Sequence, residues 1–324
     1  MSDPKPPVAK AIAYAVLSAL FFTATYVLNR ADASAGGHWA WTASLRYLWT
    51  LPMMIPIVMF AGGMSPVFKA MAKSPTQWLI WSGIGFVIFY VTLSYAADSG
   101  PSWLIAGTFC TTVVMGVLTA PLLYNDYRAR IPLNALLVGL FILIGVFLMQ
   151  WSAADGAIDR KGWIAFGLVL VSALMYPLGN RGLMLHLERE GTVLNPIQRT
   201  FGMVVASIPI WIAIAFYAYF QAGFAPQGQL INTAGVALTS GIIATVLFFQ
   251  ATDMMKHHPV GLAAAEAMQA LEIVFATLLG YVFFGEALPK FWAWIGMLIV
   301  MLGVIVFITV ARREPKATVG AAEN

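Results

Sequence analysis

The sequence predicts an all-α membrane protein with ten transmembrane helices, arranged as two inverted five-helix repeats, with the N- and C-termini in the cytoplasm. Three observations predict this fold class: the composition, the length of the apolar runs, and motifs shared by the two halves of the chain. Of the 324 residues, 60% are hydrophobic and 10% are charged, and the mean hydropathy is +0.81. A soluble domain carries about 25% charged residues. The composition therefore excludes a soluble enzyme, a disordered chain and a nucleic-acid-binding protein.

Each apolar run is long enough to cross a bilayer as a helix. A helix needs roughly 20 apolar residues to span ~30 Å of hydrocarbon, whereas membrane β-strands would give ~10-residue alternating segments. The loops between the runs are short, and no segment is left for a soluble domain. The ten runs lie near residues 10–29, 38–60, 77–97, 102–124, 132–151, 162–181, 195–220, 230–252, 259–284 and 289–311.

Lysine and arginine in the loops predict the orientation. With the N-terminus inside, twelve of these residues lie in cytoplasmic segments and four lie outside, as the positive-inside rule requires. The first run has the length of a permanent helix rather than of a signal peptide, and ten spans return the C-terminus to the cytoplasm. We expect a cytoplasmic N-terminus at 1–9, a first repeat at 10–151, an outer linker at 152–161, a second repeat at 162–311 and a disordered cytoplasmic tail at 312–324.

Motifs at matched spacing relate the two halves. Because each half has an odd number of spans, the second half would enter the membrane upside down, as in many secondary transporters. A central site is then expected between the halves near the midplane. The matches are Arg46 and Ile55-Pro56-Ile57 with Arg199 and Ile208-Pro209-Ile210, Ser82-Gly83-Ile84 with Ser240-Gly241-Ile242, Leu104 with Leu262, and Gly145-Val146 with Gly303-Val304.

The motifs around the last two runs resemble those of a known superfamily. The run from Phe284 to Pro289, with Gly285 and Glu286 at its turn, leads into a last span with Gly296 and Gly303. This organisation resembles the drug/metabolite transporter superfamily in its ten-helix EamA-like form, in the multidrug-resistance-efflux-like branch. The resemblance implies secondary transport across the membrane. The four-helix relatives carry a proton-handling glutamate in their first helix, whereas the first span here has no carboxylate.

The ninth run carries the most informative polar residues. Glu266, Gln269 and Glu272 form one polar arc among small residues, and their repeat partners in the fourth run include Thr108 and Thr111. An ionisable residue inside a span is costly and is a functional hypothesis by default. One interpretation is a pore-facing carboxylate that exchanges a proton for a cation or holds a substrate amine. The other is a structural glutamate paired with an arginine on a neighbouring helix.

Two arginines occupy mirror positions in the second and seventh runs. Arg46 and Arg199 could anchor an anionic group, could gate the pathway by pairing with Glu266 or Glu272, or could extend to the membrane interface. Further hydrogen-bonding groups that could line a cavity include Tyr26, Tyr90 and Gln250.

These residues predict a secondary active transporter that exports small organic solutes across the inner membrane by alternating access, coupled to protons. Amphipathic cations or amino-acid-like metabolites are the expected substrates. A facilitative permease for nutrient uptake is the alternative, and a membrane scaffold or enzyme with a packed centre is the third hypothesis. The four histidines lie at span ends and Cys110 is the single cysteine, so we expect no metal and no cofactor. The expected partners are the solute and the lipid bilayer, with the chain a monomer or homodimer and no nucleic acid bound.

Overall fold

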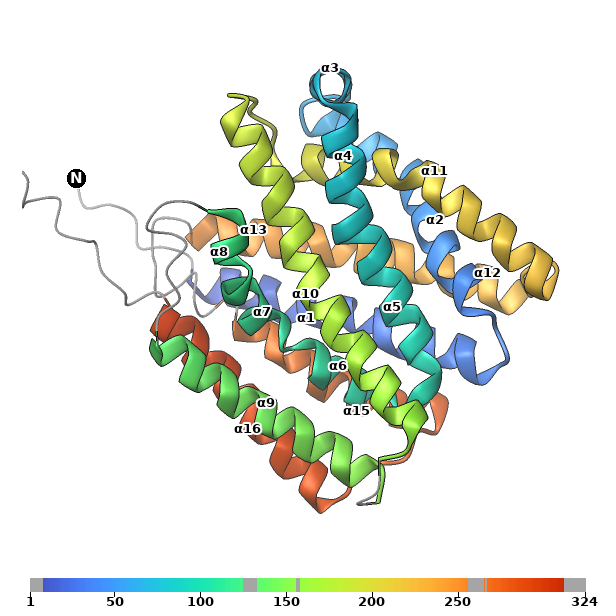
Figure 1. The fold of residues 1–324 in the computed structure, drawn as a ribbon, viewed down its shortest axis with the longest axis vertical. Coiled ribbons are helices and arrows are strands. Elements are labelled where there is room, and N and C mark those ends of the chain that lie inside the picture. Colours follow the sequence, from blue (N-terminus) through green and yellow to red (C-terminus); the bar gives the residue numbers. More distant parts are fainter. Residues whose placement is uncertain (1–7, 125–132, 156–157, 256–264, 266, 312–324) are drawn as a thin grey trace, which may run out of the picture.

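The computed structural model describes residues 8–124, 133–155, 158–255, 265 and 267–311. Regular structure within these residues is entirely helical (Figure 1). Seven helical segments are long and apolar enough to cross a membrane, and three shorter apolar helices cover 102–116, 268–284 and 291–307. Every apolar run expected from the sequence therefore contains helix. The number of spans and the side on which the termini lie stay predictions.

The helices follow one another through the two halves of the chain. The first half contains α1 (Val8–Ser34), α2 (Trp39–Phe60), α3 (Ser65–Lys73), α4 (Pro75–Ser82), π-helical η1 (Gly83–Ile88), α5 (Phe89–Ala96), 3₁₀-helical η2 (Ala97–Ser99), α6 (Ser102–Phe109), α7 (Thr112–Leu118), α8 (Ala120–Leu123) and α9 (Leu133–Ala153). The second half contains α10 (Arg160–Arg189), α11 (Pro196–Ala222), α12 (Gln227–Val236), π-helical η4 (Ala237–Ala244), α13 (Thr245–Met255), 3₁₀-helical η5 (Met268–Ala270), α15 (Leu271–Phe284) and α16 (Phe291–Ala311).

Local sequence explains several helix ends. Asn195 and Gln198 form a reciprocal capping box at the start of α11, and Asp159 accepts the backbone N–H of Gly162 at the start of α10. Such side-chain caps satisfy N–H groups that have no partner inside the helix. At the other end of α11, Gly223 has a φ of 72°, which favours glycine.

Helical irregularities occur at matched places in the two halves. The fourth run breaks at Cys110, between α6 and α7, and the ninth run changes to 3₁₀ geometry at Met268. The register that pairs Leu104 with Leu262 also pairs these two positions. The π-helical segments η1 and η4 likewise include the paired Gly83 and Gly241. Interrupted helices often line the binding sites of transporters, so these breaks mark the part of the bundle where a site is expected.

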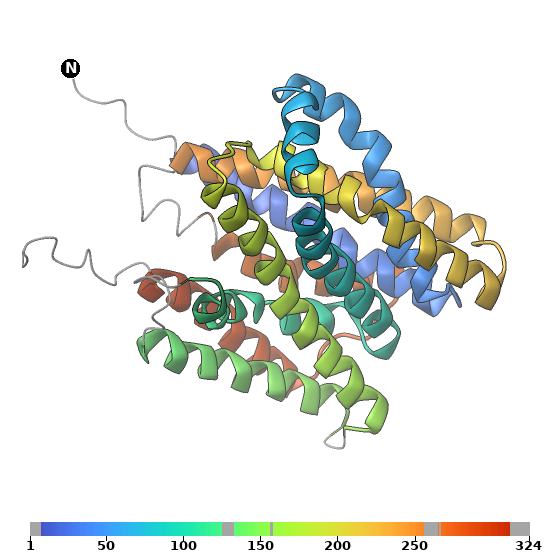
Figure 2. The ribbon, with the colours of Figure 1, turned by 45° about the horizontal axis from the view of Figure 1, so that its top comes forward.

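Two helix pairs, α2 with α11 and α9 with α16, lie side by side and run antiparallel. Asn195 at the start of α11 donates to the carbonyl oxygen of Ala61 just after α2, at 2.5 Å, and Trp41 at the start of α2 donates to the carbonyl oxygen of Gly223 after α11, at 3.0 Å. In α9 and α16, which lie together at the edge of the bundle (Figures 1 and 2), Gly303 faces Ile142. Gly296 precedes Gly303 in α16 but faces residues that follow Ile142 in α9, so this pair is antiparallel as well.

The turn after α15 is tied to the start of α6. Gly285 ends α15 in the left-handed conformation, with a φ of 63°, as glycine commonly does at a helix end. The next residue, Glu286, accepts the backbone N–H of Ser102 at 2.9 Å and the Ser102 hydroxyl at 2.7 Å. A carboxylate is stabilised by the free N–H groups at a helix N-terminus. The Gly285-Glu286 motif therefore links the ninth and fourth helical runs.

Candidate functional site

Glu272 lies at the centre of the molecule, in the first turn of α15 directly after the 3₁₀ segment η5. Its side chain is 8% exposed, and one carboxylate oxygen accepts the Tyr26 hydroxyl of α1 at 2.9 Å. Within the described part of the chain, no basic side chain forms an ion pair with this carboxylate. A buried carboxylate that lacks a cationic partner is a site where a proton or a cationic group would be stabilised.

Arg46 of α2 is the buried positive group of the same region. It is 9% exposed. Its Nη2 donates to the Ser240 hydroxyl of η4 at 3.1 Å, and the guanidinium lies over the Tyr90 ring at 4.1 Å from the ring centroid. Ser240 also accepts the Thr25 hydroxyl at 2.6 Å, whereas Nη1 of Arg46 is buried without a partner. Arg46 is therefore held inside the bundle by a cation–π contact rather than extended to a membrane interface.

Aromatic rings fill the space between the two charges. Tyr47 stacks on Trp211 with centroids 4.6 Å apart and contacts Tyr90 at 5.7 Å. The series of ring contacts continues from Tyr90 through Phe89, Tyr176 and Phe109 to Tyr26, the partner of Glu272.

Tyr176 is the most open member of this aromatic series. It is 39% exposed, and its ring contacts those of Phe89 and Phe109. Its ring is therefore the part of the aromatic series that the protein encloses least.

The site residues expected from the sequence lie in different settings. Tyr26, Glu272, Tyr90 and Arg46 belong to the central region just described. Thr108 and Thr111 are buried, but they donate to the carbonyl oxygens of Leu104 and Thr108, at 2.8 and 2.7 Å.

The remaining expected residues lie apart from these contacts or cannot be placed. Gln269 is partly buried in η5 with its Nε2 unpartnered. Gln250 is exposed on α13, and Arg199 is half-buried on α11, where its side chain has no hydrogen-bond or ion-pair partner in the described residues. Glu266 lies outside the described residues.

Ser240 and Asp32 were not expected from the sequence as residues of a site, whereas Asn29 was one of the polar groups that could line a cavity. Ser240, which holds Arg46, belongs to the motif Ser240-Gly241-Ile242, and its position in the repeat was a signal for a structural role. Asn29 accepts the Tyr90 hydroxyl at 3.0 Å. Asp32, three residues later on α1, is a second buried carboxylate.

A wide cavity opens at the end of the bundle where α1 ends and α2 begins. This vestibule has a volume of about 910 Å³ and is lined by Asn29, Trp39, Thr42, Ser94 and Tyr95, among others. Glu272 is not among its lining residues. Asn29 links the vestibule to the aromatic rings, because it lines the cavity and accepts the Tyr90 hydroxyl. The ring of Tyr90 in turn contacts the Arg46 guanidinium.

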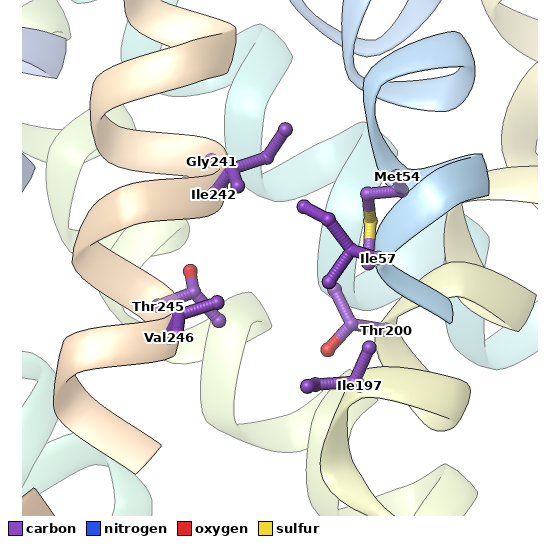
Figure 3. A pocket seen from close by; sticks show the side chains of 8 residues that line it. All are labelled: Met54, Ile57, Ile197, Thr200, Gly241, Ile242, Thr245 and Val246. Atoms are coloured by element: carbon purple, nitrogen blue, oxygen red, sulfur yellow. The ribbon is translucent and has the colours of Figure 1, made fainter. Parts of the chain in front are cut away.

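A second, much smaller cavity lies on the opposite side of Arg46. A small pocket there, between α2, α11 and the η4–α13 segment, has a volume of about 10 Å³, room for about one water molecule, and Figure 3 shows its mainly apolar lining. Along α2 the vestibule borders Thr42, the pocket borders Met54 and Ile57, and Arg46 lies between them. The two cavities that border α2 on either side of Arg46 therefore differ greatly in volume.

Comparisons with known proteins agree with this architecture. The family model EmrE, described as "Putative multidrug resistance efflux transporter", matches residues 9–313. The chain is 39% identical to "Uncharacterized protein YjlA" of Bacillus subtilis (strain 168), over 95% of this chain and 97% of that protein. It is 36% identical to "Uncharacterized 42.1 kDa protein in intracellular alkaline protease 3'region" of Shouchella clausii, over 82% of this chain and 70% of that one. A solved structure described as "Crystal structure of protein" shares the fold, with a TM-score of 0.57 and 16% identity over 94% of this chain and 98% of the other.

Proposed function

Since the chain belongs to the EmrE family of multidrug resistance efflux transporters, we propose that it is a secondary active exporter of small organic solutes. The chain is a multi-pass membrane transporter. The proposed substrates are amphipathic cations or amino-acid-like metabolites. In this proposal the protein lies in the inner membrane with both termini in the cytoplasm, and an inward flow of protons drives export.

Two inverted five-helix halves are part of the proposal. The antiparallel contacts of α2 with α11 and of α9 with α16 support this arrangement, as do the helix breaks at Cys110 and Met268. Two halves of this kind give two nearly equivalent packings, one open to each side of the membrane.

The observation that carries the proposal is the Glu272–Tyr26 hydrogen bond beside the aromatic surface. The carboxylate has a single hydrogen-bond donor and no basic partner in the described residues. A proton and a cationic solute would therefore compete for the same oxygen atoms. Binding of one would release the other, which is the chemical requirement for exchange.

The difference in volume between the two cavities on either side of Arg46 supports alternating access. The vestibule lies at the end that the loop charges assign to the outside, so this conformation would be open outward. The narrow pocket at Met54 and Ile57 would widen when the transporter faces inward. A ligand that prefers one of the two states shifts their populations only by its difference in affinity.

Transport by purified protein in lipid vesicles tests this function. Accumulation of a fluorescent aromatic cation such as ethidium should depend on an imposed pH gradient in the wild type. Glu272→Gln should abolish that dependence, and Glu266→Gln tests the carboxylate outside the described residues. Asp98→Asn is the matched control, because Asp98 is an exposed acid paired with Lys161 at 2.7 Å.

Two outcomes would contradict the proposal. Uptake by the Glu272→Gln and Glu266→Gln proteins that is as pH-sensitive as wild-type uptake would refute the role of the carboxylates. Solute counterflow that needs no pH gradient and survives both substitutions would replace the exporter with a facilitative permease.

A further inference from the structure

Asp32 is a buried carboxylate that the proposed function does not use. It lies near the end of α1 and is 2% exposed. Its Oδ1 accepts the side-chain amide of Asn232 on α12 at 2.7 Å, whereas its Oδ2 is buried and has no partner. The nearby Arg30 turns away and donates to the carbonyl oxygens of Ala97 and Asp98. No basic side chain in the described residues compensates this charge.

Gln229, one turn before Asn232 on α12, adds a second unpartnered oxygen. Its side chain is 3% exposed, and its Nε2 donates to the Thr42 hydroxyl at 2.7 Å and to the carbonyl oxygen of His38 at 3.0 Å. A carbonyl oxygen can only accept, so the amide nitrogen must face His38. The Oε1 atom is then the one left over, and it is buried without a partner.

These contacts bring acceptor oxygens together where α1, α2 and α12 meet. The acceptors are the Asp32 carboxylate, the Gln229 amide oxygen and the Thr42 hydroxyl, which accepts the Gln229 amide N–H at 2.7 Å. The unpaired donor nearest in sequence is Nδ2 of Asn29, one turn earlier on α1. A buried carboxylate and a buried amide oxygen that both lack a positive partner would be stabilised by a bound cation. Oxygen ligands suit hard cations.

The cluster lies beside the vestibule, although Asp32 and Gln229 do not line that cavity. Gly37, His38 and Thr42 line both the cluster and the cavity of about 910 Å³. A side chain at Gly37 would place its Cβ 2.8 Å from the Asp32 carbonyl oxygen and 2.9 Å from the Gln229 amide nitrogen. Glycine therefore lets the loop close over the cluster while the cavity remains beside it.

We propose that Asp32, Gln229 and Thr42 form a binding site for one sodium ion beside the vestibule, which Thr42 borders. One carboxylate neutralises one monovalent charge, and the described residues contain no group of three or more acidic, histidine or cysteine side chains that would favour a divalent or transition metal. The site is separate from Glu272. Because it joins three helices at the outer end, sodium stabilises the arrangement in which these helices are packed together.

Thermal unfolding of the purified full-length protein tests the site. The unfolding midpoint is measured in sodium, potassium and choline chloride at equal ionic strength and fixed pH. Sodium should raise the Tm by about 5 °C over choline, because a ligand that binds only the folded state stabilises it by RT ln(1 + c/Kd), where c is the free ligand concentration. Asp32→Asn should lose the sodium effect while remaining at least as stable as wild type in choline, because it removes an uncompensated buried charge.

Further variants make the test specific. Thr42→Val should raise the half-saturating sodium concentration by about tenfold. If Asp32→Asn does not fold, the Thr42→Val measurement alone tests the sodium site. Asp98→Asn removes another acid of the vestibule and should keep the full sodium shift. Glu272→Gln should also keep it, so that failure of the exporter proposal is distinguishable from failure of this one.

Two results would overturn the sodium site. Equal Tm values in sodium, potassium and choline would mean that the cluster is satisfied by water alone. A sodium shift that persists in Asp32→Asn, or an unchanged half-saturating concentration in Thr42→Val, would place the ion elsewhere.

Discussion

The contact between Arg46 and Tyr90 allows a quantitative test of the central region. The guanidinium lies 4.1 Å from the ring centroid, and both side chains are buried. A desolvated cation–π contact contributes about 2 kcal/mol. The Tyr90 hydroxyl donates to Asn29 at 3.0 Å, and a hydrogen bond of this kind contributes about 1 kcal/mol. Tyr90→Phe should therefore cost about 1 kcal/mol, because it keeps the ring.

A double-mutant cycle separates the two contributions. Tyr90→Leu removes the ring, Arg46→Met removes the charge while keeping an apolar stem, and the double variant removes both. The free energy of unfolding is measured for all four proteins in mild detergent titrated with a denaturing detergent. We expect a coupling energy of about 2 kcal/mol between the two positions.

The cycle has a clear refuting result. A coupling energy below about 0.5 kcal/mol, the usual error of additivity, would show that the ring does not stabilise the guanidinium. Equal losses for Tyr90→Phe and Tyr90→Leu would assign the whole effect to the hydroxyl group.

Two further predictions concern the turns that hold the bundle together. Gly280→Ala should lower the Tm by about 5 °C, because the new Cβ would lie 2.6 Å from the Glu286 carboxylate and 2.8 Å from the Ser102 hydroxyl, and overpacking costs about 1–3 kcal/mol. Burial lowers the pKa of His38, whose Nδ1 accepts a backbone N–H in the first turn of α2. The unfolded chain then binds the proton more tightly, so stability should decrease as the pH falls below about 6.5 and should be constant above it.

Both predictions have matched controls. Gly228→Ala should leave the Tm unchanged, since no atom lies within 4 Å of the added Cβ; an equal loss at both glycines would rule out the steric explanation. His38→Asn keeps a side-chain cap but removes the titrating ring, so the Tm of this variant should vary less between pH 7 and pH 5 than that of the wild type. An identical pH profile would assign the acid sensitivity to another group.

The sequence predicted the helices well because apolar runs of this length have few alternatives in a bilayer. The runs near 38–60 and 195–220 correspond closely to α2 and α11. The first run was expected to end near residue 29, but α1 continues to Ser34. The helix-favouring Ala31 and Ala33 allow this extension, and Asn232 of α12 binds its polar face.

This extension explains why Asp32 was missed. Beside Arg30, and beyond the expected end of the span, it had the sequence signature of a solvated loop residue. The burial of Asp32 depends on α12, which is 200 residues away along the chain.

The expected site residues divide according to how local their interactions are. Glu272 stood out because a carboxylate is rare within an apolar run. Thr108 and Thr111 were overvalued as donors, because threonine in a helix commonly donates to a carbonyl of its own preceding turn, as both do here. The contacts of Arg46 with Tyr90 and Ser240 join distant segments, and no spacing rule in the sequence predicts them.

The bond between Glu286 and Ser102 bears on how the bundle could change shape. Two hydrogen bonds from Ser102 to the Glu286 carboxylate join the beginning of the fourth helical run to the end of the ninth. These two elements should therefore move together unless both hydrogen bonds break. Bending would then occur in segments that depart from α-helical geometry, above all the π-helical segments η1 and η4. Since η4 carries Ser240, bending of that segment would displace the hydroxyl group that accepts the Arg46 guanidinium.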